Sequence, residues 1–274
     1  MGISFFRVAS AAAIALFGIG STTFAAGYSQ AITSTPGLLA YYQFSGDYSS
    51  SVNGYSGTAT TGASIGAAGT GPQLGDQPNN RPLLLDGTDG NGVTTSVTSG
   101  ISTAGSIVAF INVAQLPSVA GRHFSIAGVS QSGNDFDLLL LQDDNTIRFY
   151  TDNTGPVIGP ALTASDLGKN IFVAATYDSI LGRTLYVNGV QVATTAAGVH
   201  VAPVGTPFAI GYATAYANRA FVGSMDEVAL FNRSLTAAEV AGIYASRAAV
   251  PEPASVAMLV IAAAAVAAHH RRCC

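Results

Sequence analysis

Tryptophan is absent from this chain of 274 residues, lysine occurs once, at Lys169, and the two cysteines are the last two residues. With Cys273 and Cys274 at the very end, the rest of the chain cannot form an internal disulfide. Its stability must therefore come from a buried core, with or without a bound metal ion. The lack of tryptophan argues against strong stacking on sugars and leaves that role to tyrosine and phenylalanine.

The end of the chain combines three features in a fixed order. Pro251-Glu252-Pro253 is followed by an uncharged apolar run, 254–268, and then by a basic tail, 269–274, that contains Arg271 and Arg272. At about 1.5 Å per residue, the run spans roughly 22 Å as a helix, short of the ~30 Å hydrocarbon core. It could cross only by thinning the bilayer, with the arginines on the cytoplasmic side. These features favour a temporary hold in the membrane over an ordinary C-terminal anchor.

This order of features resembles the PEP-CTERM sorting signal of Gram-negative bacteria. The resemblance implies export through the inner membrane and cutting by an exosortase near the Pro-Glu-Pro motif. Contact with the membrane would then be transient and limited to the C-terminal segment. We expect the protein to finish at the cell surface or outside the cell.

The beginning of the chain has the pattern of a secretory signal peptide. Residues 1–7 are short and basic, residues 8–20 are apolar, and Thr23 and Ala25 place small residues where a signal peptidase reads them. A transmembrane helix is the alternative, but this apolar run is short and ends in a small-residue site. We expect residues 1–25 to be the signal peptide, with cleavage by signal peptidase after Ala25 or Ala26.

Between its two ends the chain is acidic and poor in charge. Without Arg7, Arg271 and Arg272, 8 of the 11 basic residues remain, and without Glu252, 14 of the 15 acidic residues remain, so the net charge is about −6. Nucleic acid requires a basic face, and so does electrostatic binding to anionic lipid. Neither partner is expected. The abundance of Gly, Ala, Ser and Thr describes a neutral, turn-rich extracellular β protein.

Short apolar runs separated by turn residues predict a series of β-strands. The run 106–113 is almost continuously apolar, which is typical of a strand buried on both faces. Asn188-Gly189 predicts a type I′ hairpin turn in which Val187 faces Val190. Strands at this spacing predict an antiparallel sandwich or barrel. The expected strands are 38–44, 82–85, 106–113, 136–141, 146–150, 171–177, 183–187, 190–192, 208–212 and 224–231.

Two stretches depart from the strand pattern. Thr236-Ala237-Ala238-Glu239 is a capping box, and the apolar residues after it follow a helical spacing, so a helix is expected there. Residues 54–80 are rich in Gly, Thr and Ala, which predicts an extended surface loop. Residues 247–250 would link the domain to the sorting signal.

Four blocks, in order, resemble the laminin-G-like, concanavalin A-like jelly roll. They are 37–44, the turn 84–89, the hairpin 172–189 and the closing block 221–240. The resemblance implies one all-β domain over 26–246, an antiparallel two-sheet sandwich with a signal helix before it and a short hydrophobic helix after it. Phe110 and the segment around Asn170 stand where the family usually has tryptophan. These departures keep the core apolar but weaken any sugar-binding role carried over from relatives.

Four acidic residues in the matching blocks are candidates for a metal site: Asp86, Asp89, Asp226 and Glu227. Some members of this fold hold a structural Ca²⁺ near such turns, and carboxylate and carbonyl oxygens suit that ion. The alternative is that Asp86 caps a turn and that Asp226 bonds to loops of the opposite sheet. A structural Ca²⁺ is therefore a hypothesis, and no other cofactor is expected.

Tyr212, Tyr216 and Phe221 bracket a Gly- and Ala-rich loop, 211–220, that is our candidate for stacking on a sugar. The alternative is that these rings close the core, above all Phe221. Glycosidases of this fold place paired carboxylates on one strand, as Glu-x-Asp-x-x-Glu or Glu-x-Asp-x-Glu, and the chain has no such run. Catalysis is therefore not expected.

The sequence thus predicts a secreted, exosortase-sorted recognition domain. We expect it to bind extracellular polysaccharide or a cell-surface partner in the envelope or biofilm matrix. A structural matrix protein without a specific ligand is the alternative, and a degenerate glycosidase is a weaker one.

Overall fold

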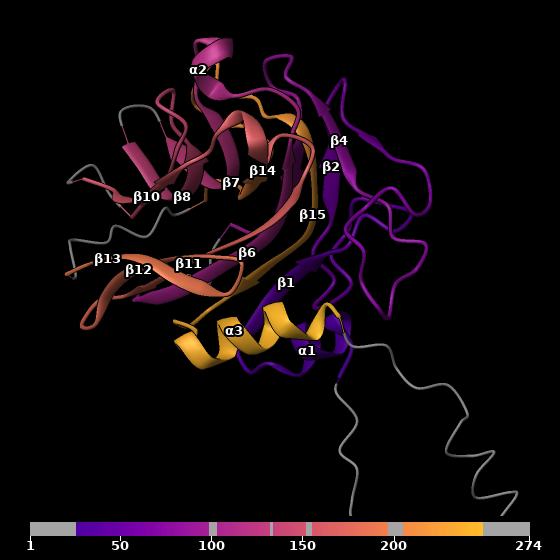
Figure 1. The fold of residues 1–274 in the computed structure, drawn as a ribbon, viewed down its shortest axis with the longest axis vertical. Helices are drawn as coiled ribbons and strands as arrows, with labels where there is room; N and C mark the ends of the chain where they lie inside the picture. The colour runs from indigo at the N-terminus through magenta and orange to yellow at the C-terminus, as the bar shows by residue number, and fades with distance from the viewer. Residues whose placement is uncertain (1–25, 99–102, 132–133, 152–154, 197–204, 249–274) are drawn as a thin grey trace, which may run out of the picture.

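The computed structural model describes residues 26–98, 103–131, 134–151, 155–196 and 205–248. In these residues two antiparallel sheets face each other, one of eight strands and one of seven (Figure 1). The predicted all-β, two-sheet sandwich is confirmed. The predicted signal helix, the C-terminal hydrophobic helix and the sorting residues Pro251, Glu252, Pro253, Arg271 and Arg272 lie outside the described residues.

The eight-stranded sheet has the order β13-β12-β11-β6-β15-β4-β3, and β1 also pairs with β15. Its strands are β1 Leu38–Tyr42, β3 Ser64–Ile65, β4 Leu83–Asp86, β6 Ala104–Val113, β11 Asn170–Asp178, β12 Gly182–Val187, β13 Val190–Thr195 and β15 Val222–Phe231. The seven-stranded sheet has the order β10-β9-β8-β7-β14-β5-β2. Its strands are β2 Gly57–Ala59, β5 Val93–Thr95, β7 Phe124–Gln131, β8 Asn134–Leu141, β9 Thr146–Tyr150, β10 Val157–Ala161 and β14 Ala209–Ile210. The helices are α1 Tyr28–Ser34, α2 Pro117–Ala120, the 3-10 turn η1 Ala164–Asp166 and α3 Ala237–Ser246.

Each predicted strand forms, although the expected strand 208–212 is shortened to β14. The predicted turn at Asn188-Gly189 is confirmed, because both residues have positive φ angles, 50° and 77°, and Val187 pairs with Val190. The sequence did not predict the strands β5, β7 and β10 or the helical segments α1, α2 and η1. The predicted long loop, 54–80, contains the two short strands β2 and β3 and several buried residues, among them Pro72, Leu74 and Asn80.

The eight-stranded sheet is apolar on both faces. Strand β6 shows this most clearly, because Ile107, Ala109 and Ile111 belong to the core between the sheets, while Val108 and Phe110 belong to a second core on the outer face. Alternate residues of a strand point to opposite faces, so a continuous apolar run of this kind requires cover on both sides. The seven-stranded sheet covers one side.

The two helices α1 and α3 cover the outer side and pack against each other (Figure 1). Tyr28 and Ile32 from α1, with Val240 and Ile243 from α3, are buried in the outer core. The Tyr28 ring lies 5.3 Å from the ring of Phe110, measured between centroids. The first and last elements of the described chain therefore form one layer.

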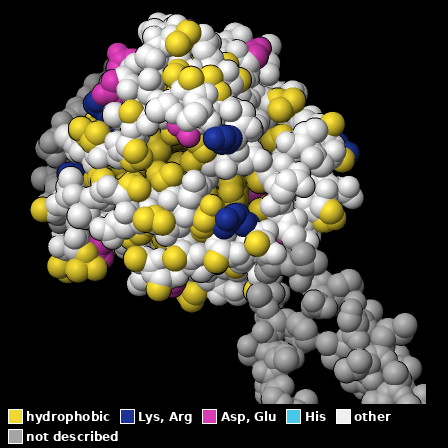
Figure 2. Space-filling view, viewed as in Figure 1, with side chains coloured by type: hydrophobic (Ala, Val, Ile, Leu, Met, Phe, Trp, Pro, Cys, Tyr) yellow, Lys and Arg dark blue, Asp and Glu magenta, His cyan; other side chains and the backbone are white. Residues whose placement is uncertain are grey.

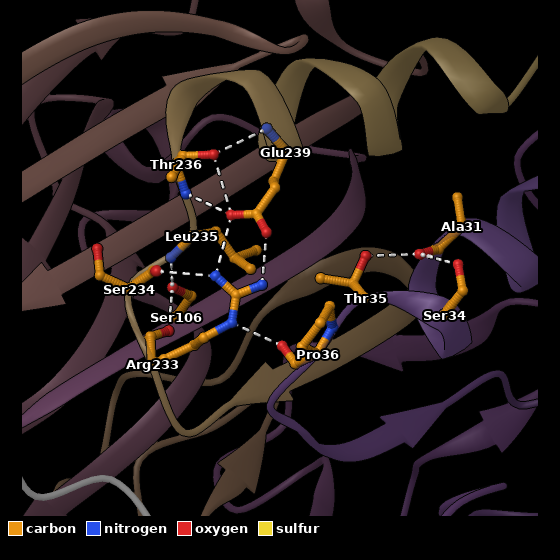
Figure 3. A network of polar contacts seen from close by, with 10 residues as sticks. All are labelled: Ala31, Ser34, Thr35, Pro36, Ser106, Arg233, Ser234, Leu235, Thr236 and Glu239. Atoms are coloured by element: carbon orange, nitrogen blue, oxygen red, sulfur yellow. Dashed lines mark hydrogen bonds and ion pairs between the residues drawn. The ribbon is translucent and has the colours of Figure 1, made fainter.

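Helix α3 begins at the predicted capping box. The Thr236 hydroxyl accepts a hydrogen bond from the Glu239 N–H at 3.2 Å, and the Glu239 carboxylate accepts one from the Thr236 N–H at 2.8 Å. The same carboxylate accepts two bonds from the guanidinium of Arg233, at 3.0 and 2.6 Å. Arg233 also donates to the carbonyl of Pro36 at 2.7 Å, which ties the start of α3 to the chain that follows α1 (Figure 3).

We expect Glu239→Gln to lower the free energy of unfolding by about 1 kcal/mol at pH 7, the size of a cap and a partly exposed ion pair. The Arg233 guanidinium, with the Thr236 N–H and hydroxyl, lowers the pKa of Glu239 to about 2. A depressed carboxyl pKa stabilises the fold at neutral pH, and this contribution is lost as the pH falls through about 2. Urea unfolding of the variant, with the exposed Ala238→Gln as a matched control, measures the effect. A loss that does not shrink in acid would contradict this explanation.

Candidate functional site

A β-bulge in β15 places two carboxyl groups on the same face of the sheet. Asp226 pairs with Phe110 and Ala229 pairs with Val108, so β15 has one more residue than β6 over this stretch. Glu227 adopts a φ angle of 55°, which is uncommon for a residue other than glycine. The extra residue interrupts the alternation of faces. Asp226 and Glu227 consequently both lie on the outer face, close to Tyr28 of α1 and to the loop that precedes β4.

The surroundings of this acid pair are almost fully enclosed. Asp226 is 1% exposed and Glu227 is 0% exposed. The Tyr41 hydroxyl donates a hydrogen bond to Glu227 Oε2, and the Glu227 N–H donates one to Asp226 Oδ1 at 2.8 Å. Asp226 Oδ2 and Glu227 Oε1 are buried without a hydrogen-bond partner.

Burial raises the pKa of both carboxyl groups of the acid pair. The pKa of Glu227 rises to about 8, chiefly because its charged form is desolvated. The pKa of Asp226 is raised well above its ordinary value by desolvation and by the neighbouring Glu227. Strongly shifted carboxyls often mark catalytic sites. Here α1 and the sheet enclose both groups, so neither can reach a glycosidic bond.

The other two predicted metal ligands lie elsewhere and already have partners. Asp86 Oδ1 accepts hydrogen bonds from the Thr88 N–H at 2.8 Å and from the Asn91 amide at 2.5 Å, and these bonds lower its pKa. Asp89 Oδ1 accepts from the Asn218 N–H at 2.8 Å. In the part of the chain that the structure describes, no three His, Cys, Asp or Glu residues group as a metal site. The four predicted ligands therefore do not form one site, and Asp86 has the turn-capping role.

Of the four predicted calcium ligands, only the acid pair, Asp226 and Glu227, remains as a candidate site. Two carboxylate oxygens without partners offer the hard ligands that Ca²⁺ takes. The backbone of the preceding loop approaches closely, because a Cβ on Gly71 would lie 2.7 Å from Asp226 Oδ2. Asp226, Glu227 and nearby backbone carbonyls would hold the ion. Calcium at this position remains a prediction.

Asp89 connects the turn 84–89 to the loop 211–220, which is the predicted sugar-binding loop. Its bond to Asn218 holds that loop beside the turn, and its carboxylate lies 3.6 Å from the guanidinium of Arg122. The guanidinium of Arg219 lies over the ring of Tyr216, 4.0 Å from its centroid. The half-buried Tyr212 exchanges a hydrogen bond with the Thr94 hydroxyl. We call Asp89, Tyr212, Tyr216, Asn218 and Arg219 the rim site.

The structure corrects the prediction for Phe221. Its ring is 0% exposed and packs against Phe124 with a centroid distance of 5.8 Å. No part of the ring can meet a ligand from solvent. Phe221 belongs to the core between the sheets, which is the alternative that the sequence left open.

A polar groove, not predicted from the sequence, lies in the loop before β4. It encloses about 540 Å³ and is lined by Ser45, Ala68, Gln77, Pro78, Asn79, Asn80 and Arg81. We call it the amide groove, because three of these side chains are amides that can donate to and accept from hydroxyl groups. The polar run 77–81 was the sequence signal, but it lay in a stretch interpreted as a plain surface loop.

One serine motif has the spacing of a catalytic nucleophile, and the structure tests whether it also has the geometry. Gly62-Ala63-Ser64-Ile65-Gly66 has the Gly-x-Ser-x-Gly spacing of a nucleophile elbow. That elbow requires a strand-to-helix turn, whereas Ser64 and Ile65 form β3 and pair with β4 in an antiparallel manner. The motif therefore lacks the geometry of a catalytic serine.

The comparisons with known proteins agree with this fold. A family profile described as the concanavalin A-like lectin/glucanases superfamily matches residues 86–241, more than half of the chain. The chain belongs to this superfamily. A second profile, the PEP-CTERM protein-sorting motif, matches residues 249–272. The motif indicates export across the inner membrane toward the cell envelope, with processing by an exosortase. No protein in the curated set matches.

Solved structures share the fold at low sequence identity. The Trypanosoma rangeli sialidase in complex with the inhibitor DANA matches with a TM-score of 0.57 and 16% identity, over 77% of this chain and 33% of that one. A second match is domain 4 of AbnA, a GH43 extracellular arabinanase from Geobacillus stearothermophilus, solved with arabinotriose. Its TM-score is 0.56 and its identity 18%, over 76% of this chain and 98% of that domain. The receptor binding domain of botulinum neurotoxin type G matches with a TM-score of 0.56 and 12% identity, over 76% of this chain and 51% of that one.

The chain spans about one third of the sialidase that it matches. At these identities the likeness establishes the fold alone. Within the residues described, no helix has the length and apolar character needed to span a bilayer.

The acid pair predicts how stability depends on pH. The pKa of Glu227 in the folded protein is about 8, above that of an exposed glutamate, so the fold favours the neutral carboxyl. Stability is then fully present below the ordinary pKa and is lost as the pH rises through about 8. We expect the urea midpoint to fall between pH 6 and pH 9, and Glu227→Gln to flatten this fall. A wild-type midpoint that rises with pH would contradict the assignment.

Calcium at the acid pair predicts a separate effect. Because the ion binds the charged carboxylates, 1 mM Ca²⁺ should raise the thermal midpoint at pH 9, and EDTA should lower it again. Asp226→Asn should abolish the shift, whereas Asp89→Asn, in the rim site, should keep it. No shift with Ca²⁺ would show that the acid pair does not bind the ion. Differential scanning fluorimetry measures each case.

Proposed function

We propose that the protein is an exported, non-catalytic recognition domain whose rim site binds a neutral polysaccharide at the cell surface or outside the cell. The observation that carries the proposal is the loop 211–220, which contains Tyr212, Tyr216, Asn218 and Arg219 and is held by the hydrogen bond from the Asn218 N–H to Asp89. Aromatic faces beside polar groups are the usual means by which proteins hold sugars, since a pyranose has apolar faces and hydroxyl edges.

The rim site provides both kinds of contact. Arg219 lies over one face of the Tyr216 ring at 4.0 Å, so a sugar would stack on the opposite face. The hydrogen bond from the Asn218 N–H to Asp89 fixes the loop before the ligand arrives. A loop that is already ordered loses less conformational entropy on binding.

The charge of the domain favours a neutral ligand. The described face in Figure 2 carries few charged side chains, scattered among polar and apolar ones. The net charge of about −6 between the two terminal segments would repel an acidic polymer. Neutral chains rich in hydroxyl groups therefore suit this surface better than uronic acid polymers.

Two further observations support recognition over catalysis. The paired carboxyls Asp226 and Glu227 are enclosed beneath α1, and the accessible Asp89 is engaged with Asn218 and Arg122. Among proteins of the same fold, the arabinanase domain was solved with arabinotriose, and the neurotoxin domain is named for receptor binding. A recognition domain carried to the envelope by a sorting signal would bind matrix polymer there.

Binding to a panel of neutral and acidic polysaccharides, including the producer's own, tests the proposal. We expect saturable binding to neutral chains, weakened at least tenfold by Tyr216→Ala, which corresponds to the loss of about 1.4 kcal/mol or more. Tyr150→Ala, which removes a half-buried tyrosine from β9, separated from β14 by β8 and β7 in the same sheet, should leave binding unchanged. Isothermal calorimetry measures the affinities.

The controls separate the alternatives. If Asn79→Ala weakens binding while Tyr216→Ala does not, the amide groove is the binding site and the rim site is not. A folded protein that binds no member of the panel would overturn the recognition role and favour a structural matrix protein.

A further inference from the structure

One short loop fastens both ends of the domain. The Ser29 N–H at the start of α1 donates a hydrogen bond to Asp76 Oδ2 at 2.9 Å, and the Gln77 amide donates to the Ser29 hydroxyl at 2.6 Å. The neighbouring Gly75 N–H donates to the carbonyl of Arg247, directly after α3, at 2.9 Å. The two ends of the described chain therefore meet at residues 75–77.

The first described residues are packed into this loop. Gly27 is buried, and a Cβ at this position would lie 2.5 Å from three atoms of Asp76, so only glycine fits there. Tyr28, the next residue, is 0% exposed. Asp76 Oδ1 and the Tyr28 hydroxyl are both buried without a hydrogen-bond partner. A buried carboxylate oxygen without a donor is costly, and it marks a place where a donor or a cation belongs.

The predicted signal-peptide cleavage supplies such a cation. Cutting after Ala25 or Ala26 leaves an α-ammonium group on Ala26 or on Gly27, the residue that lies against Asp76. An ammonium group has three donors and a positive charge. The amide of the uncut chain has one donor and no charge. We propose that the α-ammonium group created by cleavage pairs with Asp76 and so fastens α1 onto the outer face of the sheet.

This pairing imposes an order on maturation. A peptidase must hold the chain on both sides of the cut in an open conformation, but Gly27 and Tyr28 are buried when α1 is docked. Cleavage therefore precedes docking, and docking then closes the outer core over Asp226 and Glu227. The inference rests on the predicted cleavage site and not on the proposed ligand, so either can fail without the other.

The single lysine makes the pairing directly measurable. The protein is isolated from the envelope of its producer, and mass spectrometry identifies its first residue. The cleaved protein has two kinds of amine, the α-amine and the exposed Lys169, which serves as an internal reference. Acetylation by an N-hydroxysuccinimide ester at pH 8, followed by peptide mass spectrometry, gives the rate for each amine.

We expect the α-amine of the folded protein to react at least tenfold more slowly, relative to Lys169, than in Asp76→Asn. Asp47→Asn, at an exposed turn, is the matched control and should keep the protection. Equal α-amine rates in the wild type and in Asp76→Asn would overturn the proposal. A first residue other than Ala26 or Gly27 would overturn it as well.

A second measurement does not depend on the folding of Asp76→Asn. In a Lys169→Arg variant the α-amine is the only amine, so acetylation in urea followed by refolding blocks that group alone. We expect the acetylated protein to have a lower urea midpoint than the unmodified variant. An unchanged midpoint would show that the α-ammonium group does not fasten α1.

Discussion

The eight-stranded sheet must be covered on both faces, and most of the architecture depends on this constraint. In its central strand β6, Ile107, Ala109 and Ile111 are buried against the second sheet, and Val108 and Phe110 are buried on the outer face. Water on either face would leave Phe110 or Ile111 exposed, at a cost of about 2 kcal/mol for each large side chain. The second sheet covers one face, and α1 with α3 covers the other. The beginning and the end of the domain are thus required by its core.

The acid pair is a consequence of the same outer layer. The bulge in β15 directs Asp226 and Glu227 into a space that α1 closes, and the low polarity there raises the pKa of both groups. Raised pKa values alone would suggest a catalytic acid. Their enclosure indicates a role inside the domain instead, as protonated carboxyls or as ligands of a cation. The accessible chemistry lies elsewhere, in surface loops such as the one that carries the rim site, and surface loops are the part of a fold that varies most with the ligand.

Local signals in the sequence were sufficient for part of this structure. The Asn188-Gly189 turn and the Thr236 capping box act over a few residues, and both formed as predicted. Helix α1 was missed because it is seven residues long and its N-cap residue is Gly27, whereas the side chain that bonds its first turn, Asp76, is distant in the sequence. Strand β7 was missed because Ser125, Gly128 and Ser130 interrupt its apolar pattern, although all of them are accommodated inside the sheet.

The candidate sites depended on contacts between distant segments. Acidic residues in two blocks that resemble the family suggested one metal site, yet Asp86 and Asp89 bond within turns and loops while the bulge sends Asp226 and Glu227 inward. The sequence by itself determined the sorting signal, the strand pattern and the short-range turns, because these are properties of adjacent residues. Only the tertiary structure decided which carboxyls are enclosed, which aromatic rings remain at the surface and which loop joins the two ends of the chain. Each of those depends on pairings between residues far apart in the sequence, which local propensity does not encode.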